Sequence, residues 1–124
     1  MKDINIIFKT AFLISILLLI GCNQDFSSPN NNWVRDKKGC YNLRTKKLAD
    51  SLTSKYNLYL KGEKEFIKVF GQADYKINGE KYKEICYYFN SNCNNDEIIK
   101  ESDKCVFIFE FKNDSLLGFH QQCE

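Results

Sequence analysis

Apolar residues recur on one helical face over positions 41–56, and most charged residues of that stretch fall on the opposite face. This pattern predicts one amphipathic helix. We expect it to begin between Asn42 and Thr45, either of which can cap free backbone amides, and to stop near Asn57. The predicted buried face carries Tyr41, Leu48, Leu52 and Tyr56.

A second, shorter helix is predicted between Gly62 and Gly71. Glu63 and Glu65 fall in its first turn, where the helix dipole favours negative charge, and Gly71 can end it. The buried stripe of this helix is expected to be Phe66, Val69 and Phe70.

After Tyr75 the apolar period changes from helical to alternating, which indicates strands. Asn78-Gly79 is a strong signal for a tight hairpin, with strand residues 75–77 and 80–82 on either side of it. We expect the second of these strands to continue to Phe89 and a polar loop to follow over residues 90–104.

A second antiparallel hairpin is predicted from a strand at 105–111, a turn at 113–115 and a returning strand at 116–120. Alternation places three phenylalanines on one face, which we assign to the helices because three rings there bury the greater area. These are Phe107, Phe109 and Phe111. The opposite face, with Val106, Ile108 and Glu110, is expected to be partly wet.

Together these elements predict an α+β fold. Two N-terminal helices would pack on a small antiparallel sheet of about three to four strands. Aromatic residues make up 15% of the chain, which suits a small core that must bury much area per residue.

An apolar run over residues 11–20 follows Lys2 and Lys9. A basic start before an apolar segment too short to span a bilayer is typical of a secretory signal. Leu19-Ile20-Gly21-Cys22 resembles a bacterial lipobox, which implies cleavage before Cys22 and acylation of its thiol. Two or three acyl chains would anchor the protein stably without a membrane span. The competing interpretation is an ordinary signal peptide whose Cys22 is not lipidated.

The chain is therefore expected to divide into a signal peptide at 1–21, a lipidated N-terminus and flexible tether at 22–39, and one α+β domain at 40–124. The formal net charge is only +2, which does not indicate a nucleic-acid partner. Trp33 in the predicted tether is either an exposed partner-binding anchor or, as we favour, a plug packed on the sheet. Arg44, Lys46 and Lys47 are expected to form a solvated basic face, with anionic lipid headgroups as the alternative contact.

Besides the lipobox cysteine there are five others, an odd number. Because thiols tend to be oxidised outside the cytoplasm, we expect two disulfides and one leftover buried thiol. Cys93 with Cys105 would close a loop of about 13 residues, and Cys40 with Cys123 would tie the helix entrance to the last strand. Cys86 would then be free. The alternative of Cys86 with Cys123 leaves Cys40 free, and the sequence does not choose between them.

No two cysteines have C-x-x-C spacing and His120 is the only histidine, so we expect no metal and no cofactor. Any His-dependent mechanism would have to use His120, for which Cys105 is a possible cross-strand neighbour. We expect no catalysis, because a short chain lacks the length that builds a cleft.

Two helices before an antiparallel sheet, a helix ending in Val69-Phe70-Gly71 and a strand-turn-strand from Phe107 to Phe119 resemble the SmpA/OmlA (BamE-type) lipoproteins. The related β-lactamase-inhibitor-protein-like fold is similar too. The resemblance covers residues 58–119 and implies a non-catalytic scaffold that contacts envelope proteins or lipid. It carries over no binding residue, because none matches a specific motif.

We therefore expect a lipid-anchored bacterial cell-envelope protein on the extracytoplasmic side, in the outer membrane rather than the inner one. Its expected role is a non-catalytic binding or scaffold module in outer-membrane assembly or maintenance, with an envelope protein as partner. The alternative is an inhibitor-like module that binds an extracytoplasmic enzyme. Such a module would present a rigid loop, for which residues 90–104 are the candidate if Cys93 is bridged.

Overall fold

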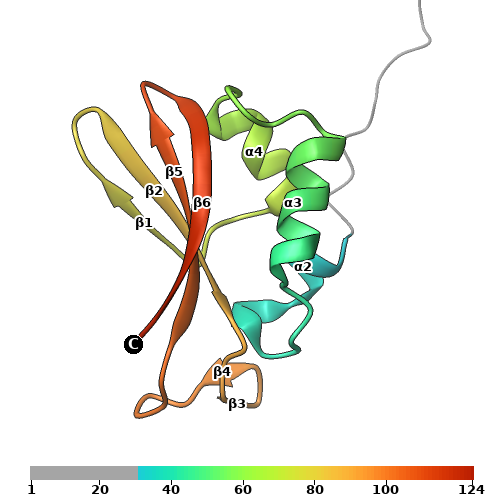
Figure 1. Cartoon of the computed structure of the whole chain (residues 1–124). Coiled ribbons are helices and arrows are strands. Elements are labelled where there is room, and N and C mark those ends of the chain that lie inside the picture. Colours follow the sequence, from blue (N-terminus) through green and yellow to red (C-terminus); the bar gives the residue numbers. More distant parts are fainter. Residues whose placement is uncertain (1–30) are drawn as a thin grey trace, which may run out of the picture.

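In the computed structural model, which describes residues 31–124, helices cover one face of a four-stranded antiparallel sheet (Figure 1). The sheet order is β1-β2-β5-β6, and β3 and β4 form a separate small hairpin. The helical elements are α2 (Asn32–Arg35), the 3-10 turn η1 (Lys37–Gly39), α3 (Lys46–Lys55) and α4 (Glu63–Phe70). The strands are β1 (Tyr75–Asn78), β2 (Tyr82–Phe89), β3 (Cys93–Asn94), β4 (Glu97–Ile98), β5 (Cys105–Lys112) and β6 (Ser115–Cys123). The predicted α+β class with a small antiparallel sheet is confirmed.

The helix α3 begins one turn later than its apolar pattern suggests. Thr45 caps it, since its hydroxyl oxygen accepts a hydrogen bond from the Leu48 amide at 3.1 Å. Tyr41 therefore lies outside the helix, and both Tyr41 and Tyr56 are about half exposed instead of buried. The face that α3 does bury consists of Ala49, Leu52 and Thr53.

The helix α4 follows its sequence pattern closely. Its predicted stripe of Phe66, Val69 and Phe70 is buried, and Gly71 ends it with a φ of 75°, a conformation that glycine adopts without strain. Gly62, at the start of α4, has no side chain that could cap the helix. The carboxylate of Asp114 acts as the cap, since it accepts a hydrogen bond from the Glu63 amide at 3.0 Å. This bond ties the start of α4 to the β5–β6 turn.

One of the two predicted hairpins has a tight turn at the expected place, and the other does not. Asn113 and Asp114 form a two-residue turn, and both have a positive φ, as a tight antiparallel hairpin requires. At the other hairpin Asn78 pairs with Lys83, so the connection spans residues 79–82 and the expected two-residue turn at Asn78-Gly79 is wrong. The Gly79 amide instead donates to the Tyr82 carbonyl at 2.7 Å, which closes a wider loop.

The core is aromatic, and Trp33 lies at its centre. Its ring centroid is 4.9 Å from that of Phe107 and 5.0 Å from that of Phe70, and the indole is fully buried. The three predicted phenylalanines of β5 also point into this layer. Trp33 is therefore the plug, and the folded part begins at α2 and not at residue 40. The expected tether boundary at residue 39 is corrected accordingly, because α2 and η1 belong to the domain.

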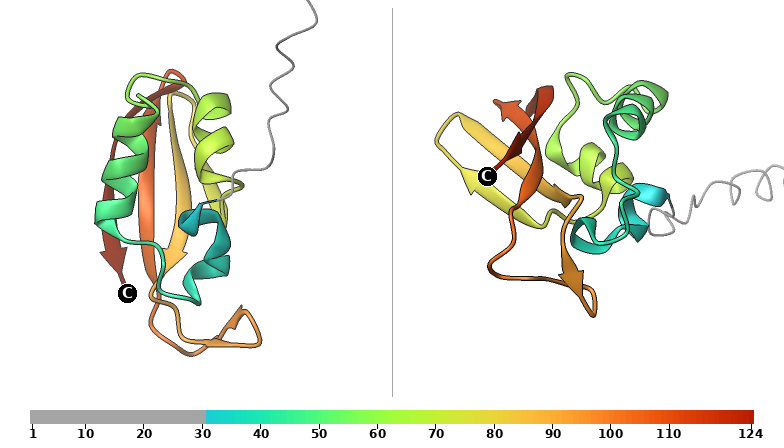
Figure 2. Two further views of the ribbon diagram at one scale, coloured as in Figure 1. Left: turned by 90° about the vertical axis from the view of Figure 1, so that its right-hand side faces the viewer. Right: turned by 60° about the horizontal axis from the view of Figure 1, so that its bottom comes forward.

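The second face of the sheet carries no helix, as the views in Figure 2 show. Val106 and Ile108, expected to be partly wet, are almost fully buried there, together with Cys86. Tyr75 and Tyr88 pack against them and supply the cover that helices give on the other side. The sheet thus has a large aromatic core on one face and a small apolar cluster on the other.

Candidate functional site

Arg44 is buried between the helical layer and the sheet, where it binds three different segments. Its Nη1 donates to Asp74 Oδ2 at 2.7 Å and to the Tyr88 carbonyl at 2.8 Å. Its Nε donates to the Trp33 carbonyl at 3.0 Å. The guanidinium carbon also lies 5.2 Å from the centroid of the Tyr87 ring. The expectation that Arg44 belongs to a solvated basic face is wrong, because these groups replace its water.

Asp36 holds the chain segment that delivers Arg44. Its carboxylate is fully buried and accepts hydrogen bonds from the amides of Tyr41, Leu43 and Arg44 at 2.7, 2.8 and 3.0 Å. Hydrogen bonds to an ionised acceptor are stronger than neutral ones. The loop between η1 and α3 is therefore built around one carboxylate.

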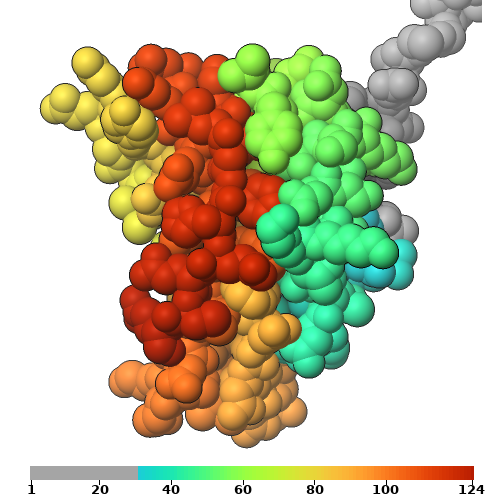
Figure 3. Space-filling model, viewed as in Figure 1, coloured from blue at the N-terminus to red at the C-terminus, as the bar shows by residue number. Residues whose placement is uncertain are grey.

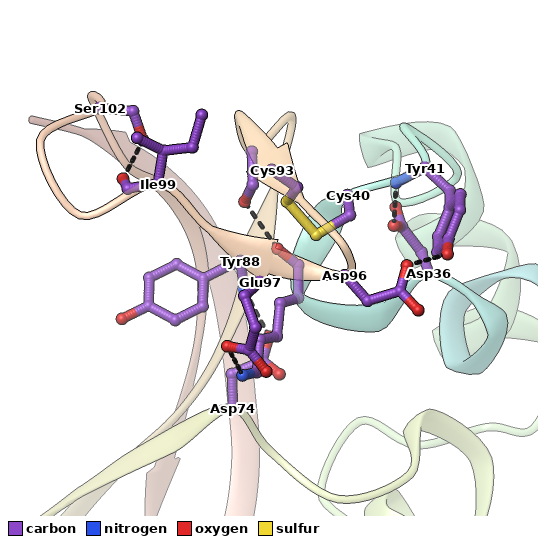
Figure 4. Close-up of a disulfide and its surroundings, with 12 residues drawn as sticks. Asp36, Cys40, Tyr41, Asp74, Tyr88, Cys93, Asp96, Glu97, Ile99 and Ser102 are labelled. Atoms are coloured by element: carbon purple, nitrogen blue, oxygen red, sulfur yellow. Dashed lines mark hydrogen bonds and ion pairs between the residues drawn. A yellow bond between two sulfur atoms is a disulfide. The ribbon is translucent and has the colours of Figure 1, made fainter.

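The loop over residues 90–104 is fastened to the η1 segment at several points (Figure 4). A disulfide joins Cys40 to Cys93, and Lys38 forms an ion pair with Glu97. The Tyr41 hydroxyl donates to Asp96, which raises the pKa of that phenol. Glu97 likewise raises the pKa of Lys38 by accepting a hydrogen bond from its ammonium.

The expected pairing of Cys93 with Cys105 is wrong, because Cys93 is bound to Cys40. Gly39 sits directly against β2, so closely that an added Cβ would lie 2.5 Å from the Phe89 Cα. The Ser91 hydroxyl then donates to the Lys38 carbonyl at 2.6 Å. The chain leaving β2 therefore passes beside Cys40 before it reaches β5.

The second disulfide joins Cys105 to Cys123, which are direct partners in the register of β5 and β6. The expected pairing of Cys40 with Cys123 is therefore wrong, as is the alternative of Cys86 with Cys123. Cys86 is free and buried on the sheet face without helices, and burial raises the pKa of its thiol. The four bridged cysteines are the candidates named from the sequence, in a different pairing.

A groove of about 740 Å³ opens beside this region. Its wall includes Val34 and Ile67, while its polar lining includes Lys38 and Asp74. Each of these two charged groups is already paired, with Glu97 and with Arg44. The groove therefore combines apolar contact with polar groups of both signs, which suits a protein segment better than a single ion.

The helix-free face of the sheet is the second candidate binding surface. Tyr75 and Tyr88 stand next to each other there, with ring centroids 5.5 Å apart. Burial raises the pKa of Tyr75. Glu84 and Glu110 are direct partners on neighbouring strands of this face. Like charges in directly opposed positions destabilise the pairing of two strands. Aromatic side chains are enriched at protein contact surfaces, so the tyrosine pair makes this face a candidate for binding a partner.

His120 lies on β6 at the rim of the same face and is exposed. Its Nδ1 is 3.5 Å from Glu110 Oε1, and its register partner is Ile108. Cys105, the thiol considered as its neighbour, is bound in a disulfide and carries no free nucleophile. Within residues 31–124, no group of three or more histidine, cysteine, aspartate or glutamate side chains is arranged to hold a metal ion.

Cys22, the predicted lipidation site, lies outside the described residues, as do the signal peptide and the first half of the predicted tether. Among residues 31–124, no helix has the length and apolar character needed to cross a membrane. Comparison of the chain with known protein families, curated proteins and solved structures gives no match. The assignment of function therefore rests on the residues themselves.

Proposed function

We propose that this protein is a lipid-anchored component of the bacterial cell envelope, held on the extracytoplasmic side through Cys22. The lipobox-like segment Leu19-Ile20-Gly21-Cys22 supports the anchor. Two disulfides in a domain of this size support an oxidising compartment, because small extracytoplasmic domains gain most from such cross-links. We place it in the outer membrane in preference to the inner one.

The folded domain, in this proposal, is a non-catalytic binding module for another envelope protein. The observation that carries it is the helix-free sheet face, on which exposed Ile77 and Tyr82 extend from the pair Tyr75 and Tyr88 toward the β1–β2 connection. Solvent-exposed aromatic and apolar side chains in one region are typical of protein contact surfaces. The arrangement of two helices before an antiparallel sheet also supports a likeness to the SmpA/OmlA (BamE-type) lipoproteins, and so a part in outer-membrane assembly or maintenance.

The anchor and the partner are tested separately. Metabolic labelling with a fatty-acid analogue should mark the wild-type chain and not the Cys22→Ser variant, and labelling that persists in the variant would contradict the attachment site. A photoreactive amino acid at Tyr82 should crosslink one partner in intact cells. The same group at Lys47, an exposed position on α3, is the matched control. Equal crosslinking from both positions would contradict the sheet face as the binding surface.

A second candidate function is inhibition of an extracytoplasmic enzyme, and the loop over residues 90–104 favours it. Its disulfide to Cys40 and its ion pair to Lys38 restrict the loop before any partner binds. Restricting a binding loop in advance lowers the entropy cost of association. If the crosslinked partner is a hydrolase, the purified chain should inhibit it, and cleavage of the Cys40–Cys93 disulfide should weaken the inhibition.

A further inference from the structure

The segment between α3 and α4 exposes the apolar side chain of Leu60 to solvent, and backbone hydrogen bonds to β6 fix this segment. Leu60 is the most exposed large apolar residue in the described part of the chain, at 77%. Its φ is 66°, a region that costs free energy for a leucine. The Leu60 amide donates to the Leu116 carbonyl at 3.0 Å, and the Leu116 amide donates to the Lys61 carbonyl at 2.9 Å. The structure thus fixes Leu60 outward on the start of β6.

Other exposed apolar residues gather at the same end of the molecule. They come from the end of α3, from the segment before α4 and from the start of β6, which meet at the upper end in Figures 1 and 3. We name these four side chains the apical patch: Tyr56, Tyr59, Leu60 and Leu117. Each is more than two-fifths exposed. Two tyrosines beside two leucines have the composition of a membrane–water interface.

The charge around the apical patch is favourable for an anionic surface. Lys61 directly follows Leu60 and is exposed, and the Lys55 ammonium lies 5.3 Å from the centroid of the Tyr56 ring. Of the acidic groups at the start of α4, Glu63 pairs with Lys76 and Lys83, whereas Asp114 accepts from the Glu63 amide and keeps its charge. Lysines beside apolar tips attract anionic lipid headgroups.

The predicted anchor lies within reach of this end. Asn31, the first described residue, donates from its side-chain amide to the Val69 carbonyl near the end of α4. The start of α4 adjoins the apical patch, and eight helical residues span about 12 Å. The nine peptide steps from Cys22 to Asn31 span at most about 30 Å when extended. A chain anchored at Cys22 can therefore place the apical patch on the same bilayer.

We propose that the apical patch docks on the bilayer surface through Leu60, Leu117 and the two tyrosines, with Lys61 facing anionic headgroups. The inference rests on the proposed anchor at Cys22. An anchor turns this second contact into an intramolecular one, so a patch that binds weakly by itself becomes occupied. Docking at this end sets the orientation of the domain and leaves the Cys40–Cys93 end pointing away from the lipid.

The test uses the full lipidated chain, reconstituted in vesicles of phosphatidylethanolamine and phosphatidylglycerol that carry brominated acyl chains. Leu60→Trp places a fluorophore in the apical patch. The matched control is Ile99→Trp, an exposed apolar position beyond β4 at the opposite end of the molecule. Trp33 is fully buried, and the emission of the wild-type chain is subtracted as its background.

Brominated lipid should remove most of the added emission of Leu60→Trp and little of that of Ile99→Trp. Adding Lys61→Glu to Leu60→Trp should reduce the quenching. No quenching of Leu60→Trp, or equal quenching at both positions, would overturn the docking. Flotation of the chain with the vesicles reports the anchor independently. Loss of flotation would contradict the anchor at Cys22, whereas flotation without quenching would contradict docking by the apical patch.

Discussion

Arg44 donates a hydrogen bond to Asp74 at 2.7 Å across a sequence separation of 30 residues, and both side chains are mostly removed from water. Asp74 uses the same Oδ2 to accept from the Tyr88 amide at 2.8 Å. One ion pair therefore connects the segment before α3, the segment before β1 and the end of β2. Loss of either partner would leave a buried charge without compensation.

The first prediction concerns this pair. Arg44→Met should lower the free energy of unfolding by about 3–5 kcal/mol, because Asp74 and two carbonyls would lose their donor. Lys46→Met is the control, since Lys46 pairs with Asp50 on the exposed side of α3, and the change there should be below about 1 kcal/mol. Urea denaturation followed by circular dichroism measures both. Similar losses in the two variants would show that burial gives Arg44 no special role.

The second prediction concerns the disulfides. Peptide mapping without reduction should recover Cys40 linked to Cys93 and Cys105 linked to Cys123, and a Cys93–Cys105 peptide would contradict the structure. In the chain-entropy description, the bridge spanning 53 residues stabilises by about 4 kcal/mol and the one spanning 18 by about 3 kcal/mol. Cys40→Ser with Cys93→Ser should therefore lower the unfolding midpoint more than Cys105→Ser with Cys123→Ser.

The third prediction concerns Cys86, whose thiol is buried and whose pKa is raised. A raised pKa lowers the thiolate fraction at any given pH, and burial blocks access of the reagent. Iodoacetamide should therefore leave Cys86 unmodified in the folded protein at neutral pH and modify it fully in urea. Mass spectrometry reads out the adduct. Rapid labelling of the native protein would mean that the sheet face without helices is open to solvent.

The fourth prediction is a pH dependence that arises at Glu63. Hydrogen bonds from Lys76 and Lys83 lower the pKa of this carboxyl, and burial opposes the shift only in part. A group whose folded pKa is lowered stabilises the fold above its unfolded pKa, and that stabilisation is lost as the pH falls through the folded value. Glu63→Gln should therefore cost about 1 kcal/mol at neutral pH, limited by screening of the partly exposed lysines.

At acidic pH, below the folded pKa of Glu63, the difference between Glu63→Gln and wild type should vanish. Urea unfolding at a series of pH values follows this convergence. Glu65→Gln serves as control, because Glu65 is exposed and pairs with Lys68 within the same helix. A constant difference across the acid range would rule out an electrostatic origin.

The fifth prediction concerns Trp33 and the start of the domain. Trp33→Ala should cost about 3–5 kcal/mol, as for other large buried aromatic side chains. Trp33→Phe should cost less, since it keeps a ring in the core and removes an indole N–H that has no acceptor among the described residues. Asn32→Ala, at the neighbouring exposed position, should be nearly neutral. Thermal melts of the three variants would show whether residues 31–39 belong to the fold.

Local patterns were sufficient where the structure depends on residues near in sequence. The stripe of α4, the cap at Thr45 and the two-residue turn at Asn113-Asp114 all follow from side chains within a few positions of each other. The face carrying Phe107, Phe109 and Phe111 follows from the alternation of a strand. The odd number of cysteines in the domain likewise leaves one without an intramolecular partner.

The remaining features depend on which distant segments meet, and no local period encodes that. Arg44 carries a charge that would suit the surface, yet it is buried because it donates hydrogen bonds to Asp74 and to the Trp33 carbonyl. Cys93 meets Cys40 because η1 packs against the end of β2. The sequence by itself determined the buried stripe of α4, the strands of the four-stranded sheet, the core-facing phenylalanines of β5 and the candidate anchor at Cys22. Only the tertiary structure decided the disulfide partners, the burial of Arg44 and the place of Trp33, because each depends on contacts between residues far apart in the chain.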